Sequence, residues 1–216
     1  MKGSLRGRYF KSAELERLAN DLLDLYRRQC DFPIRPPLQA DLIAESVGLN
    51  ILWEEVQEEP KTTVCAEIRP DERLIVINER RRRLLENNPG LYNTTVAHEL
   101  GHWWLHIDHA ALNHEELPGY IRSFAPPRAP DGRDRRDERN AHEFMGYLLM
   151  PSSLLLPRIE DMNLQSWRSL YRLRDEFGVT ITAMKVQLEK LGLTYVDDGG
   201  RFHRSRQEAE GQNSLF

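Results

Sequence analysis

From Asn93 to His106 the chain reads NTTVAHELGHWWLH, and this stretch determines how the remaining sequence is interpreted. His98, Glu99 and His102 form the pattern H-E-x-x-H. Residues four apart on an α-helix are offset by about 40° and about 6 Å, so both imidazoles can bind a single ion. Glu99 lies about 100° further round the helix, beside the ion, where its carboxylate can accept a proton. Zinc with an open position lowers the pKa of a bound water to about 7, so the pattern predicts hydrolytic chemistry.

The H-E-x-x-H pattern requires a helix that is buried on one side. Asn93 or Thr94 is a suitable N-cap for it. Its expected apolar face consists of Val96, Ala97, Leu100, Trp103 and Trp104. The alternative is a core helix with two incidental surface histidines, and a third metal ligand elsewhere in the chain distinguishes the two interpretations.

Glu138 is the main candidate for the third ligand. It lies at the head of a helical stretch, on the same face as the apolar residues Ala141 and Met145. A carboxylate on a core-facing stripe is costly to bury unless a cation meets it, and a metal ion supplies that charge. The alternative role of Glu138 is to stabilise the helix N-terminus electrostatically. Asp108, nearer the motif, is a further candidate carboxylate ligand.

Three other side chains are candidates for supporting roles. His142 lies one turn after Glu138 and can hydrogen-bond a ligand or bind the metal itself. His106 lies about 12 Å along the helix from His98, too far for both to bind one tetrahedral ion. We therefore expect His106 outside the ligand set or on the surface. His142, His106 and Tyr147 are the candidates to stabilise an oxyanion.

Composition indicates a cytoplasmic globular protein with no obligatory nucleic-acid or membrane partner. The 216 residues carry a formal net charge of −4. The four arginines at 80–83 are flanked by glutamates, which favours a solvated helix face over a nucleic-acid patch. No apolar run reaches the length of a membrane span, and the N-terminus leads into no signal-peptide core. Cys30 and Cys65 are far apart in sequence, as suits a reducing compartment.

Hydrophobic periodicity and turn residues predict the other elements. The expected elements are helices at 12–30 and 38–47, strands at 51–53, 62–68 and 74–78, and helices at 137–151, 164–177 and 181–191. A loop at 110–136 can cover the cleft. Gly178-Val179-Thr180 resembles the turn of a helix-turn-helix. We expect the two flanking helices to pack and not to bind DNA, because the second has few groups suited to base edges.

The motifs together resemble the ImmA/IrrE family of metallo-endopeptidases over roughly residues 12–195. The resemblance is carried by Ile75 to Asn78, by HELGH at 98–102, and by Glu138-x-x-Ala141-x-x-Phe144 ending in Leu148-Leu149-Met150-Pro151. It implies a gluzincin-like core in which Glu138 is the third zinc ligand. It also implies an intracellular protease that cleaves a helix-turn-helix repressor, and the repressor gene often lies beside the protease gene. Cleavage would relieve repression of stress or mobile-element genes. The chain departs from the family at His142, where Asn or Asp is usual, and at Met145 and Gly146, where small residues are usual.

The predicted fold class is α+β, with a zincin-like core. This core comprises a small three-stranded antiparallel sheet, the H-E-x-x-H helix and the following glutamate-bearing helix, with helices after it. The predicted division is a metallopeptidase domain at 1–155, a C-terminal helical, helix-turn-helix-like subdomain at 156–196, and a disordered tail at 197–216.

The predicted function is that of a cytoplasmic zinc endopeptidase acting on a helix-turn-helix (XRE-type) repressor encoded nearby. His98, His102 and Glu138 hold zinc, or manganese, since three nitrogen and oxygen ligands admit both ions. Glu99 is the catalytic base. The alternative is a DNA-associated regulator without proteolytic activity, in which His142 closes a structural four-ligand metal site.

Overall fold

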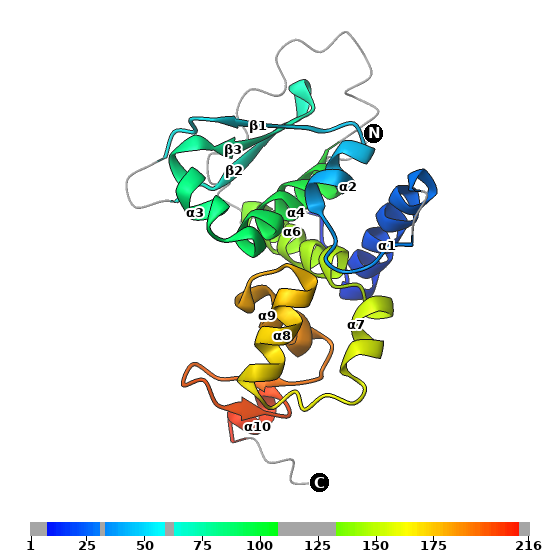
Figure 1. Ribbon diagram of the computed structural model, residues 1–216, viewed down its shortest axis with the longest axis vertical. Helices are drawn as coiled ribbons and strands as arrows, with labels where there is room; N and C mark the ends of the chain where they lie inside the picture. The colour runs from blue at the N-terminus through cyan, green and yellow to red at the C-terminus, as the bar shows by residue number, and fades with distance from the viewer. Residues whose placement is uncertain (1–7, 31–32, 59–62, 108–132, 212–216) are drawn as a thin grey trace.

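A computed structural model describes residues 8–30, 33–58, 63–107 and 133–211 (Figure 1). Its helices are α1 (Ser12–Gln29), α2 (Ala40–Ser46), α3 (Arg82–Glu86), α4 (Pro89–His106), α6 (Arg133–Leu149), α7 (Ser152–Ile159), α8 (Trp167–Phe177), α9 (Ile181–Lys190) and α10 (Arg206–Ala209). Its strands are β1 (Asn50–Glu54), β2 (Ala66–Arg69), β3 (Leu74–Asn78), β4 (Tyr195–Val196) and β5 (Phe202–His203). Short 3-10 helices lie at Pro70–Glu72 and Glu79–Arg81. The fold class is α+β, as predicted.

The three-stranded sheet is mixed, so the prediction of an antiparallel sheet is wrong for one strand. The strand order is β1-β3-β2, in which β2 is antiparallel and β1 is parallel to β3. A short connection through Arg73, in the left-handed region at φ 49°, joins β2 directly to β3 and makes that pair antiparallel. β1 instead pairs with the opposite edge of β3. Hydrophobic pattern identifies a strand but not the edge at which it joins a sheet.

Helices α4 and α6 form the centre of the molecule and lie side by side (Figure 1). The sheet packs on α4 through β2, and α1 packs on α6. Gly101 permits the close approach of the two central helices, because a Cβ at this position would lie 3.1 Å from backbone atoms of Ala141. One hydrophobic cluster extends from Phe10 to Val196, and the predicted boundary between residues 155 and 156 stays a prediction.

Helix α4, which carries the H-E-x-x-H pattern, begins earlier than predicted. Asn88 precedes α4, and Pro89 occupies its first turn, where a proline needs no backbone donor. Asn93 is therefore inside the helix and does not cap it. Its side-chain oxygen accepts a hydrogen bond from the backbone N–H of Ala40, and its amide donates to the carbonyl of Gly178. The side chain thus connects α4 to the start of α2 and to the segment between α8 and α9.

The C-terminal part contains α8 and α9, as predicted, and two features that were not predicted. Helix α7 includes Pro157, a residue that counts against a helix in sequence-based reasoning. The described part of the tail predicted to be disordered contains β5, which pairs with β4 just before the tail, and α10. Trp167 donates its indole N–H to the carbonyl of Gly200, and the Asp197 carboxylate lies 3.0 Å from His203, so the hairpin is fixed by local contacts.

Most of the loop expected at 110–136 lies outside the described residues, and α6 begins at Arg133.

Across the ranges that the structure describes, the helices are too short or too polar to cross a membrane.

Candidate metal centre

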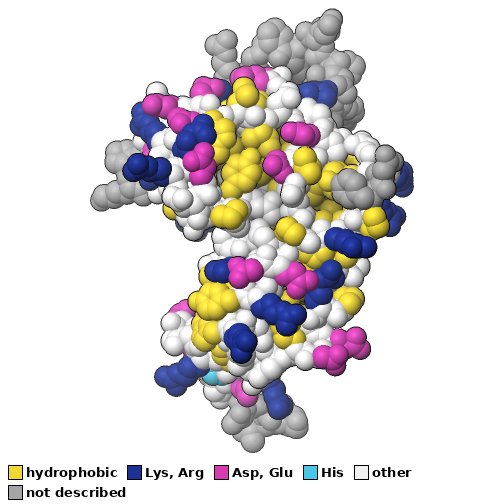
Figure 2. Space-filling model, viewed as in Figure 1, with side chains coloured by type: hydrophobic (Ala, Val, Ile, Leu, Met, Phe, Trp, Pro, Cys, Tyr) yellow, Lys and Arg dark blue, Asp and Glu magenta, His cyan; other side chains and the backbone are white. Residues whose placement is uncertain are grey.

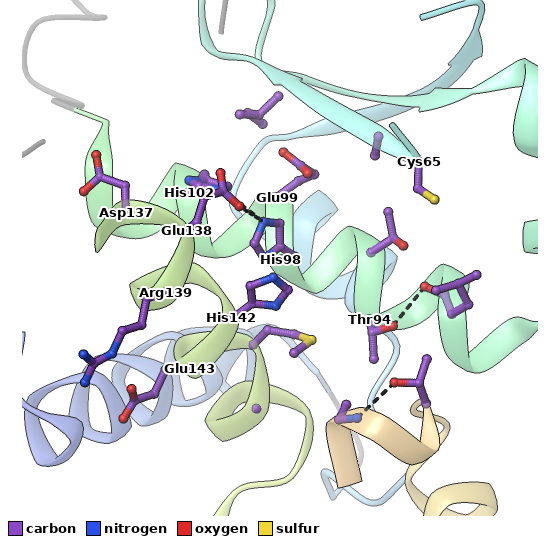
Figure 3. Close-up of a pocket in the computed structure, with 18 of the residues that line it drawn as sticks. Cys65, Thr94, His98, Glu99, His102, Asp137, Glu138, Arg139, His142 and Glu143 are labelled. Atoms are coloured by element: carbon purple, nitrogen blue, oxygen red, sulfur yellow. Dashed lines mark hydrogen bonds and ion pairs between the residues drawn. The ribbon is translucent and has the colours of Figure 1, made fainter. Parts of the chain in front are cut away.

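Three side chains from the two central helices bring their donor atoms together (Figure 3). The Nε2 atoms of His98 and His102, one turn apart on α4, lie 3.1 Å from each other. Glu138 extends from α6, so that one carboxylate oxygen lies 3.2 Å from Nε2 of His98 and the other 3.2 Å from Nε2 of His102. The three residues predicted as ligands are therefore close together in space.

The spacing of these donors fits a single metal ion. Zinc–nitrogen and zinc–oxygen bonds of about 2.0–2.1 Å in a tetrahedron place neighbouring donors about 3.4 Å apart. The side chains of His98 and His102 are only 15% and 17% exposed, whereas that of Glu138 is 54% exposed. Two imidazoles and one carboxylate are donors that a single metal ion can share.

The protonation states of the three donors favour cation binding. Burial lowers the pKa of His98 to about 4, so its imidazole is neutral near pH 7. Hydrogen bonds with His102 and then with His98 hold the pKa of the Glu138 carboxyl well below its usual range. For His102, burial lowers the pKa, but Glu138 and Glu99 outweigh burial and raise it overall. A metal must displace any proton from His102, and metal affinity consequently depends on pH.

Glu99 is a buried carboxylate on the same helix as the two histidines. It points from α4 toward β2, on the side where Cys65 lies (Figure 3). The residue is 9% exposed, and burial raises the pKa of its carboxyl to about 7. Nearby Glu138 raises this pKa further, while His102 opposes the rise. A base with a pKa near the working pH can both accept and return a proton efficiently.

His142 lies next to the ligands but further from the point where the donors meet. Its ring centroid is 4.3 Å from that of His98. His142, His98 and Glu138 form a second group of three donors, whose atoms lie within 4.8 Å of one another. The group that contains His102 is tighter, at 3.1–3.2 Å, so it also fits a single ion. His142 faces this set from the next turn of α6.

The other two predicted supporting residues occupy different places. His106 is buried, and its Nδ1 lies 3.2 Å from Nδ1 of His102. Its Nε2 lies 3.4 Å from the carboxylate of Asp137, a residue that was not predicted. Tyr147 is buried on α6, where its hydroxyl meets Ser12 of α1, and it is not among the residues that line the cleft.

His98, His102 and Glu138 line a cleft of about 1030 Å³. One side is formed by residues 63–68, which lead into and include most of β2, and the opposite side by one face of α9. Thr182, Val186 and Lys190 contribute to that face at helical spacing. Sequence reasoning missed α9 as part of the site, because the contact between residues so distant in the chain depends on tertiary packing.

Comparison with known proteins identifies the family. The model of the peptidase M78 family, described as the IrrE N-terminal-like domain, matches residues 44–189. No curated protein matches. A solved structure of a Mycobacterium tuberculosis transcriptional regulator is similar at 14% sequence identity with a TM-score of 0.48; the match covers 87% of this chain and 58% of that chain. The resemblance to the ImmA/IrrE family is confirmed by the family model: the chain belongs to the M78 peptidases, a family of metal-dependent hydrolases.

Proposed function

We propose that this protein is a zinc-dependent endopeptidase. The observation that carries the proposal is the convergence of His98, His102 and Glu138 within 3.2 Å, with the buried carboxylate of Glu99 on the same helix. Three protein ligands leave one coordination position open, whereas a structural zinc site uses four. Manganese is the alternative ion for this donor set.

Hydrolysis requires a nucleophile, a base and a proton for the leaving group. A zinc ion bound by the three ligands supplies Lewis-acid activation of water and of the peptide carbonyl. Glu99 accepts the proton that water loses as its oxygen attacks the carbonyl carbon. Glu99 then donates this proton to the amide nitrogen as the carbon–nitrogen bond breaks.

The cleft favours a peptide substrate in an extended conformation. β2 is an edge strand of its sheet, and Ala66, Glu67 and Ile68 line the cleft. An edge strand can pair with an extended peptide through backbone hydrogen bonds. Such a peptide would cross above α4, between β2 and α9, and place one carbonyl next to Glu99.

A helix-turn-helix repressor in the cytoplasm is the substrate that the ImmA/IrrE resemblance suggests. Two features support a proteolytic role for the C-terminal helices over the alternative of DNA binding. The matched family region includes α8 and most of α9, and one face of α9 lines the cleft. Figure 2 shows basic and acidic side chains interspersed over the described part of one face, without a continuous basic surface of the kind that duplex DNA requires.

Cleavage of a candidate repressor tests the proposal. The zinc-loaded wild type, Glu99→Gln and Glu86→Gln are incubated with the repressor encoded nearest the gene, and cleavage is measured over matched times. Glu86 is exposed on α3 and serves as a control for the same chemical change. We expect cleavage by the wild type and by Glu86→Gln, and a loss of at least about 100-fold for Glu99→Gln. Equal cleavage by all three would contradict the role of Glu99.

Operator binding tests the alternative function. The wild type is titrated with the operator of the same repressor at two salt concentrations. We expect only weak, sequence-independent association. Salt-dependent binding that prefers the operator over unrelated DNA, without any cleavage, would favour the DNA-associated regulator.

A further inference from the structure

We propose that His106 and Asp137 are positioning residues, which hold the ligand His102 in one tautomer and orientation through a chain of contacts that ends at a carboxylate. The chain runs from Nδ1 of His102 to Nδ1 of His106 over 3.2 Å, and from Nε2 of His106 to Oδ1 of Asp137 over 3.4 Å. This inference rests on the metal centre of the proposed function, and extends it to two residues that bind no metal themselves.

The direction of each proton follows from the geometry. Nε2 of His102 faces His98 and Glu138 and is therefore the nitrogen that binds the ion. A neutral imidazole that binds through Nε2 carries its proton on Nδ1, and this proton points at Nδ1 of His106. His106 must accept it, so His106 carries its own proton on Nε2. Oδ1 of Asp137 lies 3.4 Å from this nitrogen, and we infer that it accepts the proton once the metal is bound.

His106 cannot join the ligand set itself. Its nearest contact is with Nδ1 of His102, the nitrogen on the side of the ring away from the ligands. His106 therefore lies behind His102 as seen from the ion. Its side chain is 3% exposed and that of Asp137 is 13% exposed, so little water competes for these contacts. Metal-binding imidazoles are commonly oriented by a carboxylate in this way, and here a second imidazole lies between the two groups.

The same contact also connects the two helices that provide the ligands. His106 is the last residue of α4, and Asp137 directly precedes the ligand Glu138 on α6. We infer that the contact between His106 and Asp137 helps to fix the position of Glu138 relative to His102. We expect loss of this contact to weaken metal binding in two ways, by freeing the His102 ring and by loosening Glu138.

Zinc affinity tests the inference without use of a substrate. Zinc is titrated into each metal-free variant in competition with a chromophoric chelator. We expect His106→Leu and Asp137→Asn to bind zinc about 10- to 100-fold more weakly than the wild type. In His106→Asn the side-chain oxygen occupies the place of Nδ1 and can accept the proton of His102, so this variant should recover most of the affinity. Leu105→Ala, at the neighbouring buried position, should lower thermal stability but leave zinc affinity unchanged.

A spectroscopic measurement separates positioning from a general effect on folding. In zinc-loaded protein with 15N-labelled histidine, the wild type and His106→Asn should show a slowly exchanging proton on Nδ1 of His102, and His106→Leu should lose this protection. Wild-type zinc affinity in both His106→Leu and Asp137→Asn would overturn the positioning role alone. A wild type that binds no zinc would overturn the proposed metal centre as well.

Discussion

The carboxylate of Glu138 lies 3.2 Å from Nε2 of His98, although the two residues are 40 positions apart in the sequence. The side-by-side packing of α4 and α6 creates this contact, and Gly101 allows it by admitting the backbone of α6 close to α4. The proposed metal centre therefore lies at the interface between two helices, and changes at this interface should affect metal binding and stability together.

The first prediction concerns Glu138. Glu138→Gln keeps the shape of the side chain but removes its charge, and a neutral amide oxygen is a much weaker ligand than a carboxylate. We expect zinc affinity to fall by more than about 100-fold, beyond the range typical of residues outside the ligand set. Competition with a chelator measures the change, and Glu160→Gln, an exposed glutamate after α7, is the matched control. Equal zinc affinity in Glu138→Gln and wild type would remove Glu138 from the ligand set.

The second prediction concerns the stability of the metal-free protein as a function of pH. The pKa of Glu99 is about 7 in the folded protein, above the ordinary 4.5, so the folded state retains a proton that the unfolded state has lost. The stabilisation linked to this proton is fully present below pH 4.5 and is lost as the pH rises through 7. Glu99→Gln should therefore be more stable than wild type at pH 8, by about 3 kcal/mol, and similar to it near pH 4.5.

Denaturant unfolding in the presence of a chelator, at pH 5 and pH 8, measures this difference. Glu86→Gln controls for the loss of an acidic side chain at an exposed site. If the stability difference between Glu99→Gln and wild type is the same at pH 5 and pH 8, burial does not hold the Glu99 carboxyl protonated.

The third prediction concerns Gly101. Gly101→Ala gains about 1 kcal/mol in helix propensity, but the new Cβ would lie 3.1 Å from the Cα and carbonyl oxygen of Ala141. Backbone atoms of a packed helix yield little, and overpacking typically costs about 1–3 kcal/mol. We expect a net loss of about 1 kcal/mol in the free energy of unfolding and weaker zinc binding, because α6 is displaced from α4. A more stable Gly101→Ala protein with unchanged zinc affinity would contradict this.

The fourth prediction concerns Asn93, whose side chain bonds to three backbone groups in two separate segments. Its oxygen accepts from Ala40, and its amide donates to the carbonyls of Leu38 and Gly178. Asn93→Ala leaves these groups without this partner, at a cost of about 2–4 kcal/mol. Thermal or denaturant unfolding measures the loss. Asn87→Ala, at an exposed position after α3, should change stability by less than about 0.5 kcal/mol, and an equally small effect at Asn93 would contradict the prediction.

The fifth prediction concerns the α9 side of the cleft. Val186 lines the cleft and is 45% exposed, so it is available for contact with a substrate. Val186→Asp should lower kcat/KM for repressor cleavage by about 10-fold or more, while zinc affinity and stability stay close to wild type. Leu156→Asp is the matched control, because Leu156 is also 45% exposed but does not line the cleft. Equal activity of the two variants would exclude Val186 from substrate binding.

The local features of the site could be predicted from sequence, because they depend on helical spacing. His98 and His102 share a face four residues apart, and Glu138 begins an apolar stripe on another helix. The start of α4 was mistaken, because Asn93 has the chemistry of an N-cap but uses its side chain for bonds between segments. A capping residue can be recognised by type, whereas its actual partner depends on the packing of the whole chain.

Features that join distant segments could not be predicted. The parallel pairing of β1 with β3 depends on which sheet edge is free after β2 and β3 have paired. The contact between His106 and Asp137 depends on how far α4 and α6 overlap along their axes. Helical rise alone predicts that His106 lies outside the ligand set, which is consistent with its position behind His102, but spacing does not reveal its acidic neighbour Asp137.

The most direct test of the central claim is a crystal structure of the zinc-loaded protein, with the metal located by anomalous scattering at the zinc edge. We predict one ion bound by Nε2 of His98, Nε2 of His102 and the carboxylate of Glu138, with a water in the fourth position within reach of Glu99. An ion whose fourth ligand is His142, with no water bound, would make the site structural and would contradict the proposed peptidase activity.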